Sequence, residues 1–161
     1  MSDDVLIRPA EVEDVAVILK LITELAEYER LASEVEATEA DLRASLFGPT
    51  PRAEAIVAEV GGDAVGFALW FHNYSTFLAR PGLYLEDLFV RSQWRGRGVG
   101  GALLRHLARI AVERGCGRME WSVLDWNEQA IGFYRSIGAR GMDEWTVNRL
   151  AGDALHRLAK A

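Results

Sequence analysis

The residues best placed to do chemistry form a basic, glycine-rich loop near the middle of the chain. The loop, Arg95-Gly96-Arg97-Gly98-Val99-Gly100-Gly101, follows the apolar run Leu88-Phe89-Val90 and precedes a helix-forming sequence. Because glycines have no side chain, consecutive backbone N–H groups there can point at one anion, and the helix N-terminus adds a positive partial charge. The pattern predicts a strand, a phosphate-binding loop and a helix, with a diphosphate bound by the N–H groups of residues 97–101.

Two common phosphate-binding motifs do not fit this loop. The dinucleotide fingerprint needs Gly-x-Gly-x-x-Gly after the first strand and an acid about twenty residues later, whereas the P-loop needs Gly-Lys-Ser/Thr. A glycine-rich turn without any ligand is the alternative interpretation.

A pair of acids, Glu86 and Asp87, interrupts the apolar strand that leads into the loop. Neighbours on a strand point to opposite faces, so we expect only one of the two to face a given cleft. Burial of an unpaired carboxylate is costly, so the pair predicts either a cationic substrate or an ion pair with an arginine such as Arg80 or Arg91.

The motifs taken together resemble those of the GNAT N-acetyltransferases. The loop is similar to their acyl-CoA loop, and a later segment is similar to their second cofactor-contacting segment: Trp126-Asn127-Glu128, Gly132-Phe133-Tyr134 and Gly138-Ala139. Four further stretches are similar to the spermidine/spermine and thialysine acetyltransferases: Arg8-Pro9-Ala10, Glu24-Leu25-Ala26-Glu27-Tyr28-Glu29, Tyr84-Leu85-Glu86-Asp87 and Asp125-Trp126-Asn127-Glu128. The resemblance covers nearly the whole chain, from Val5 to about Leu158, although the segment after Gly138 is shorter than in the polyamine enzymes.

The resemblance implies a site for acetyl-CoA, and the residues themselves give no support for a metal. The pantetheine arm is expected to pair with the exposed edge of the strand before the loop, where a neighbouring strand splays away. The residues implied in cofactor binding are Leu88, Phe89, Val90, Arg95, Gly96, Arg97, Gly98, Val99, Gly100, Gly101, Asn127, Phe133 and Tyr134.

The resemblance also implies roles in proton transfer and in substrate binding. An amine must lose a proton before it attacks, and the departing thiolate needs an acid. Tyr134 occupies the position of the general acid, and Glu86 is the better candidate for the base; for Tyr134 the alternative is ordinary packing. The residues implied at the amine are Tyr28, Glu29, Glu86, Asp87, Trp121, Asp143 and Trp145.

The function that follows is direct transfer of an acetyl group from acetyl-CoA to a primary amine of a small cation, a polyamine or a thialysine-like molecule, in a ternary complex. One alternative acceptor is a protein N-terminus or a lysine side chain. Another alternative is a non-catalytic acyl-CoA-binding regulatory module, for which loss of the loop glycines or of the acid would be the signature.

Composition is compatible with this function and argues against several others. The 161 residues are 50% hydrophobic, which is enough for one core, so we expect a single domain spanning residues 1–161. A net charge of −6 argues against nucleic acid, and three scattered histidines with one cysteine give no metal-ligand spacing and no internal disulfide. With no apolar run long enough for a membrane span, we expect a cytoplasmic protein; the family resemblance implies a homodimer.

Periodicity along the chain predicts an α/β protein with a sheet of mixed direction and helices packed on it. The resemblance implies that this is the GNAT fold, with a mixed, mostly antiparallel sheet of six to seven strands flanked by helices. Gly61-Gly62 predicts a hairpin turn, and Thr38 followed by Asp41 predicts the start of a helix. The expected strands are 5–8, 53–60, 64–73, 83–90, 118–124 and 144–150, and the expected helices are 11–27, 38–48, 100–114, 128–137 and 153–159.

Overall fold

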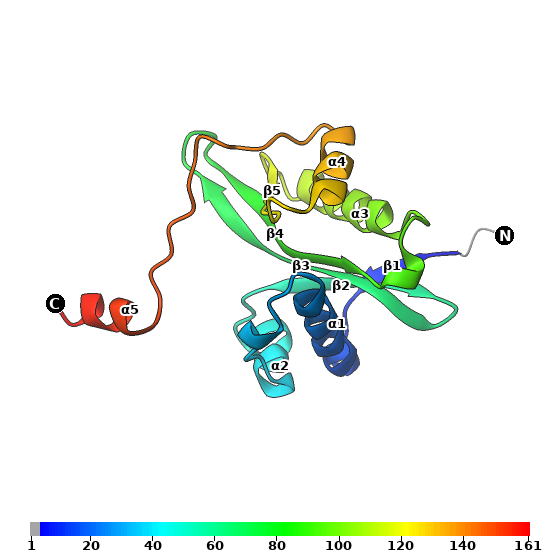
Figure 1. Cartoon of the computed structure of the whole chain (residues 1–161), viewed down its shortest axis with the longest axis horizontal. Helices are drawn as coiled ribbons and strands as arrows, with labels where there is room; N and C mark the ends of the chain where they lie inside the picture. The colour runs from blue at the N-terminus through cyan, green and yellow to red at the C-terminus, as the bar shows by residue number, and fades with distance from the viewer. Residues whose placement is uncertain (1–3) are drawn as a thin grey trace. The chain divides into compact units, whose positions relative to one another are not determined.

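The structure, a computed structural model, describes residues 4–161, which divide into two compact units (Figure 1). The first unit ends at Ser122, and the second comprises Val123–Ala161. The loop and the acid pair singled out above belong to the first unit, and Tyr134 belongs to the second.

A five-stranded sheet in the order β1-β2-β3-β4-β5 forms the base of the first unit. The first four strands pair antiparallel to one another, and β5 pairs parallel to β4. This confirms the mixed, mostly antiparallel sheet, with five strands in place of the six to seven expected. The strands are β1 (Leu6–Pro9), β2 (Glu54–Val60), β3 (Asp63–Ser75), β4 (Arg80–Val90) and β5 (Met119–Trp121).

The prediction of a last strand at residues 144–150 is wrong. This segment of the second unit forms neither strand nor helix, and its side chains are exposed throughout. The alternation of Trp145 and Val147 suits a strand, but a strand also needs a neighbouring backbone to accept and donate its hydrogen bonds. Within residues 4–161, the sheet ladder joins only β1 to β5.

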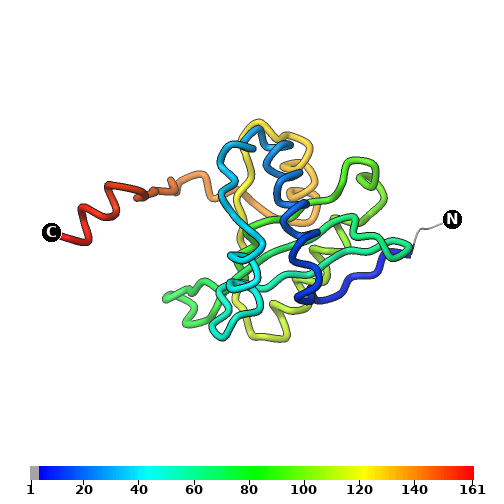
Figure 2. Tube along the Cα trace, turned by 90° about the horizontal axis from the view of Figure 1, so that it is seen from below, coloured from blue at the N-terminus to red at the C-terminus, as the bar shows by residue number. Residues whose placement is uncertain are grey.

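Helices lie on both sides of the sheet. α1 (Val15–Tyr28) and α2 (Glu39–Phe47) cover one side, and α3 (Val99–Glu113) covers the other; seen from below, α1 and α2 lie in front of the strands (Figure 2). The local signals in the sequence are confirmed. Thr38 and Asp41 form a reciprocal capping box at the start of α2, and Gly61 and Gly62 make the β2–β3 turn with φ of 59° and 87°.

The core beneath α1 and α2 joins these helices to one face of the sheet. Its members on α1 are the buried Val15, Ile18 and Leu21, which recur at helical spacing and pack with Phe67 of β3 and Phe89 of β4. Burial of such side chains contributes about 1.5–3 kcal/mol each, so this cluster fixes where α1 ends relative to β4.

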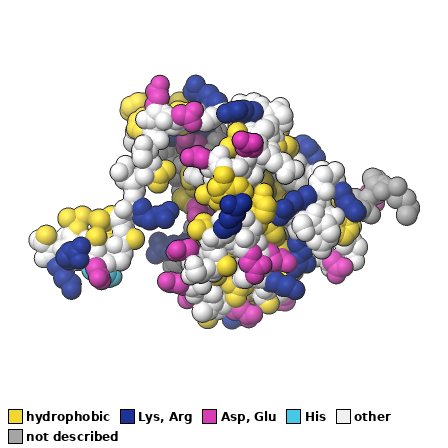
Figure 3. Space-filling model, in the orientation of Figure 1, with side chains coloured by type: hydrophobic (Ala, Val, Ile, Leu, Met, Phe, Trp, Pro, Cys, Tyr) yellow, Lys and Arg dark blue, Asp and Glu magenta, His cyan; other side chains and the backbone are white. Residues whose placement is uncertain are grey.

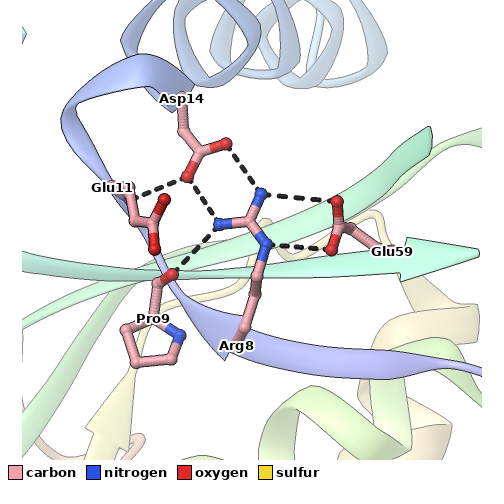
Figure 4. Close-up of polar contacts among 5 residues, drawn as sticks. All are labelled: Arg8, Pro9, Glu11, Asp14 and Glu59. Atoms are coloured by element: carbon pink, nitrogen blue, oxygen red, sulfur yellow. Dashed lines mark hydrogen bonds and ion pairs between the residues drawn. The ribbon is translucent and has the colours of Figure 1, made fainter. Parts of the chain in front are cut away.

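An arginine network fixes the other end of α1 (Figure 4). Arg8 of β1 donates two hydrogen bonds to Asp14, at 2.7 and 2.8 Å, and one from Nε to Glu59 of β2 at 2.9 Å. The guanidinium lowers the pKa of the Asp14 carboxyl. The residues of the network also line a groove together with Lys20 and Trp94. Because its acids are paired with Arg8, we assign this cluster a structural role.

The second unit contains two helices, α4 (Glu128–Ser136) and α5 (Gly152–Ala159). Asn127 caps α4 by accepting a hydrogen bond from the Ala130 N–H at 3.3 Å, and Gly138 follows its end with φ of 93°. Hydrophobic side chains gather along one side of α5, where Leu155 and Leu158 are exposed (Figure 3). Within residues 4–161, every helix is too short or too polar to cross a lipid bilayer.

Candidate active site

The strand before the glycine loop has an edge that its neighbour leaves open. β5 pairs with β4 only from Leu83 to Leu85, where the partners are Met119 and Trp121. Beyond Leu85, β4 continues to Val90 paired with β3 on its other side. The edge of residues 86–90 therefore carries backbone groups that can pair with an extended, amide-containing ligand.

A β-bulge lies where this edge begins. On β3, Leu69 is opposite Asp87 and the next residue, Trp70, is opposite Leu85, so Glu86 is an extra residue in β4. A bulge breaks the regular alternation of side chains. The expectation that Glu86 and Asp87 occupy opposite faces of a regular strand is therefore wrong at this point.

Three acids gather around the bulge. Glu29, the C-cap residue of α1, is close enough to act electrostatically on Asp87, as does the adjacent Glu86. Burial, together with these two carboxylates, raises the pKa of Asp87 to about 6. Burial also raises the pKa of Glu29. The cluster is an anionic site that favours a cation or a proton.

Arg95 connects the loop to the end of α1. Its Nε donates a hydrogen bond to the Val90 carbonyl at 2.8 Å. Its guanidinium lies over the Tyr28 ring at 4.4 Å and near the Phe89 ring at 5.4 Å. Stacking of this kind is worth about 0.5–2 kcal/mol, so Arg95 links the start of the loop to the helix end beside the three acids.

The loop itself has the backbone that its glycines predict. Gly96 and Gly98 have φ of 75° and 83°, a left-handed conformation that other residues rarely adopt, and Gly98 is the N-cap of α3. The first hydrogen bond of the helix is donated by Ala102 to the Gly98 carbonyl at 3.0 Å. The N–H groups of Val99, Gly100 and Gly101 precede this first helical hydrogen bond and have no carbonyl one turn back, so they can bind an anion.

An open stretch of sheet continues from Asp87 along the face that α1 and α2 cover elsewhere. Asp87 lies two residues from Phe89 of the core, which places it on this face. Tyr84 lies on the same face, because its ring contacts Phe71 of β3 at 5.2 Å and its hydroxyl lies 3.1 Å from Ser122 Oγ. Side chains of intermediate or high exposure thus form a floor beyond the end of α1.

A polar group ends this floor on β5. Arg118 forms an ion pair with Glu120, with Nε 3.0 Å from Oε1, and Asn73 of β3 donates to the same carboxylate at 3.4 Å. The Asn73 side chain reaches β5 across Gly82, and a Cβ at Gly82 would clash with the Asn73 Oδ1. No local pattern in the sequence indicates these residues, because they come together only when β3, β4 and β5 pair.

The other predicted site residues lie on α4, on the segment after it and on β5. Asn127 caps α4, and the rings of Phe133 and Tyr134 contact each other at 5.9 Å. Asp143 and Trp145 belong to the exposed segment after α4, where Trp145 is 77% exposed. Trp121, in the first unit, is half-buried on β5 opposite Leu85. In the part of the chain that the structure describes, no three histidine, cysteine or acidic side chains are arranged to hold a metal ion.

Residues 18–139 match the model of the acetyltransferase (GNAT) family. Among curated proteins, the thialysine N-epsilon-acetyltransferase of Bos taurus is 39% identical over 166 residues, which cover 96% of this chain and 97% of that protein. The L-ornithine N5-acetyltransferase NATA1 of Arabidopsis thaliana is 36% identical, over 96% of this chain and 87% of that protein.

Solved structures show the same fold. The integron cassette protein VCH_CASS6, from the mobile metagenome of V. cholerae, superposes with a TM-score of 0.81 at 32% identity. The match covers 100% of this chain and 99% of that chain.

Proposed function

The chain belongs to the GNAT family of acetyltransferases, and on that basis we propose that it transfers an acetyl group from acetyl-CoA to a primary amine of a small cationic substrate. The observation that supports this substrate class best is the group of three acids, Glu29, Glu86 and Asp87, at the bulge where the open edge of β4 begins. A cation bound there would relieve the repulsion among the carboxylates. A polyamine and a thialysine-like amine both have the required charge.

The fit to acetyl-CoA rests on the open edge of β4 and on the loop. The edge of residues 86–90 offers backbone groups to an amide-containing arm, and the N–H groups at the start of α3 suit a diphosphate. Acetyl-CoA supplies an activated acetyl thioester when it binds. We propose that Leu88 to Val90 hold the arm and residues 97–101 hold the diphosphate, while Arg95 fixes the loop through Val90 and Tyr28.

The three carboxyls of the cluster can bind the amine and prepare it for attack. An alkyl ammonium has a pKa near 10.4, so it must give up a proton before it can attack. The family resemblance favours Glu86 as the base, but burial and repulsion raise the pKa of Asp87 to about 6, nearer to neutral pH than that of an ordinary carboxyl. We propose that Asp87 receives the proton, directly or through water, and that Glu86 and Glu29 hold the cation.

The departing thiolate requires a proton donor, and Tyr134 is our proposed donor. A phenol with a pKa near 10 can protonate a thiolate of similar basicity. Tyr134 lies on α4, whose start is fixed by the Asn127 cap. With the acetyl thioester and the amine both bound, direct transfer needs no covalent enzyme intermediate, and alignment supplies much of the rate.

We also propose that the protein is a homodimer. In the second unit, Trp145 and Val147 are 77% and 80% exposed, and Leu155 and Leu158 are exposed on one side of α5. An exposed series of large apolar side chains is typical of an interface. Light scattering at micromolar concentration should give twice the mass of the 17.9 kDa chain, and a monomer would refute the proposal.

A screen of acceptors tests the function. Purified protein with acetyl-CoA should acetylate members of a set of diamines, spermidine, thialysine and basic amino acids, with initial rates that show both substrates bound together. Turnover of lysine-containing peptides or protein N-termini alone would favour the alternative acceptor. Tight acetyl-CoA binding without turnover of any amine would favour the regulatory module.

A further inference from the structure

The floor between Asp87 and β5 ends in a pair of opposite charges, and this pair has no part in the proposed transfer. Arg118 and Glu120 are two residues apart, so their side chains share one face of the strand. Asn73 of β3 donates to Glu120 on the same face as Phe71. The pair therefore lies on the same surface as Asp87 and Tyr84, on the side where α1 ends.

The spacing along this surface follows from the strand register. Asp87 is opposite Leu69 and Tyr84 is opposite Phe71, so the two positions lie two residues apart on β3, about 7 Å. Glu120 is opposite Tyr84 on the next strand. One strand spacing across and two residues along place the Glu120 backbone about 8 Å from that of Asp87. A basic amino-acid side chain has a length of this order.

The charges differ at the two ends of the floor. The end at Asp87 holds three acids, whereas the end at β5 holds one cation beside one acid. A diamine brings a cation to both ends, and at β5 it meets the guanidinium of Arg118. An α-amino acid with a distal amine brings a carboxylate and an ammonium to β5, where each has a partner of opposite charge.

Both members of the pair can accept a further partner. The side chains of Arg118 and Glu120 are 46% and 35% exposed. Among the contacts described for these two residues, Arg118 uses Nε, and Glu120 uses Oε1 for both Arg118 and Asn73. The two Nη groups and Oε2 remain for a ligand. An exposed pair contributes little stability by itself, so a ligand can rearrange it at little cost.

We propose that Arg118 and Glu120 form a specificity subsite that binds the zwitterionic head of an α-amino acid while its distal amine lies at Asp87. Arg118 binds the α-carboxylate, Glu120 binds the α-ammonium, and Asn73 orients Glu120. This inference rests on the proposed acetyltransferase function and adds a preference to it. The subsite positions the substrate and does not contact the reacting atoms.

Matched substrates test the subsite. Lysine and cadaverine have the same distal amine and chain, and they differ only in the α-carboxylate. The native enzyme should have the higher kcat/KM with lysine, and lysine methyl ester should lose about tenfold or more, mainly through KM, because a charge-assisted contact is absent. This comparison needs no variant, so it holds even if a substitution impairs folding.

Variants then assign the effect to residues. Arg118→Gln should lower kcat/KM for lysine by about tenfold or more and leave cadaverine unchanged or improved. Glu120→Gln should lower kcat/KM for both lysine and cadaverine. Arg109→Gln, an exposed change on α3, is the control and should alter neither. If cadaverine is the better substrate of the native enzyme, or Arg118→Gln affects both amines equally, the subsite is refuted and the acetyltransferase function stands. Binding of acetyl-CoA without turnover of any amine would refute the function itself.

Discussion

Replacement of Asp87 by asparagine should make the substrate-free protein more stable at neutral pH while it lowers activity. The carboxyl is partly buried beside Glu86 and Glu29, and its pKa is raised from the ordinary 3.8 to about 6. A group whose pKa is higher in the folded state contributes most to stability below its unfolded pKa, and this contribution is lost as the pH rises through the folded value. Above pH 6 the charged Asp87 therefore opposes folding.

The magnitude follows from the two pKa values. A rise from 3.8 to about 6 corresponds to about 3 kcal/mol of unfolding free energy, as an upper estimate. For a chain of this size such a gain raises Tm by roughly 6 to 12 °C. Asparagine keeps the size of the side chain and removes the charge, so the variant should show this gain at pH 8 and lose it towards pH 4.

Urea unfolding of both proteins between pH 4 and pH 8 measures the difference. Asp63→Asn at the exposed β2–β3 turn is the control and should stay within about 0.5 kcal/mol of the native protein at every pH. A cationic amine should stabilise the native protein more than the Asp87 variant. Equal stability at pH 8, or a gain that persists at pH 4, would refute the electrostatic explanation.

Three further changes test the loop, the acid and the structural network. Gly98→Val places a branched side chain at φ of 83° and should abolish measurable acetyl-CoA binding by calorimetry, whereas Gly62→Val imposes a similar strain at the β2–β3 turn, outside the loop, and should leave binding intact. Tyr134→Phe keeps the ring and should lower kcat by about 10²-fold without weakening acetyl-CoA binding; full turnover would remove Tyr134 from the mechanism. Asp14→Asn should cost about 1.5–3 kcal/mol at pH 7, because Asp14 accepts two hydrogen bonds from Arg8. Since the pKa of Asp14 is lowered by folding, its contribution is present above the ordinary carboxyl pKa and disappears as the pH falls through the folded value, so native and variant stabilities should converge in acid.

The features that depend on local chemistry were predictable from the sequence. Gly96 and Gly98 specify a loop that opens a helix, and Thr38 with Asp41 specifies the start of α2, because these effects need only a few neighbouring residues. The family resemblance also predicted the open edge of β4, and this agrees with the short pairing of β5 with β4, which stops at Leu85.

The features that depend on packing were not predictable. The end of α1 lies beside Asp87 because its apolar stripe packs under Phe89, and nothing near Glu29 in the sequence indicates this. The alternation of residues 144–150 indicates a strand, yet alternation alone does not provide a partner backbone. No local signal in the sequence marks the bulge at Glu86, because the extra residue can be recognised only from the pairing of β4 with β3.

The extra residue at Glu86 reverses the face of the sheet that odd-numbered residues of β4 occupy. Before it, Leu83 and Leu85 at odd positions are buried outside the cluster beneath α1 and α2, and after it Phe89, also odd, belongs to that cluster. One continuous strand can therefore supply apolar side chains to opposite layers and bring Tyr84 and Asp87 to the same surface. Deletion of Glu86 would restore regular alternation of side chains along β4. Either Leu83 and Leu85 would then move to the face that Tyr84 occupies, or Asp87 would turn into the layer of the two leucines. For folding, we expect this position to tolerate many substitutions but no change in length, whereas substrate binding should depend on its carboxylate.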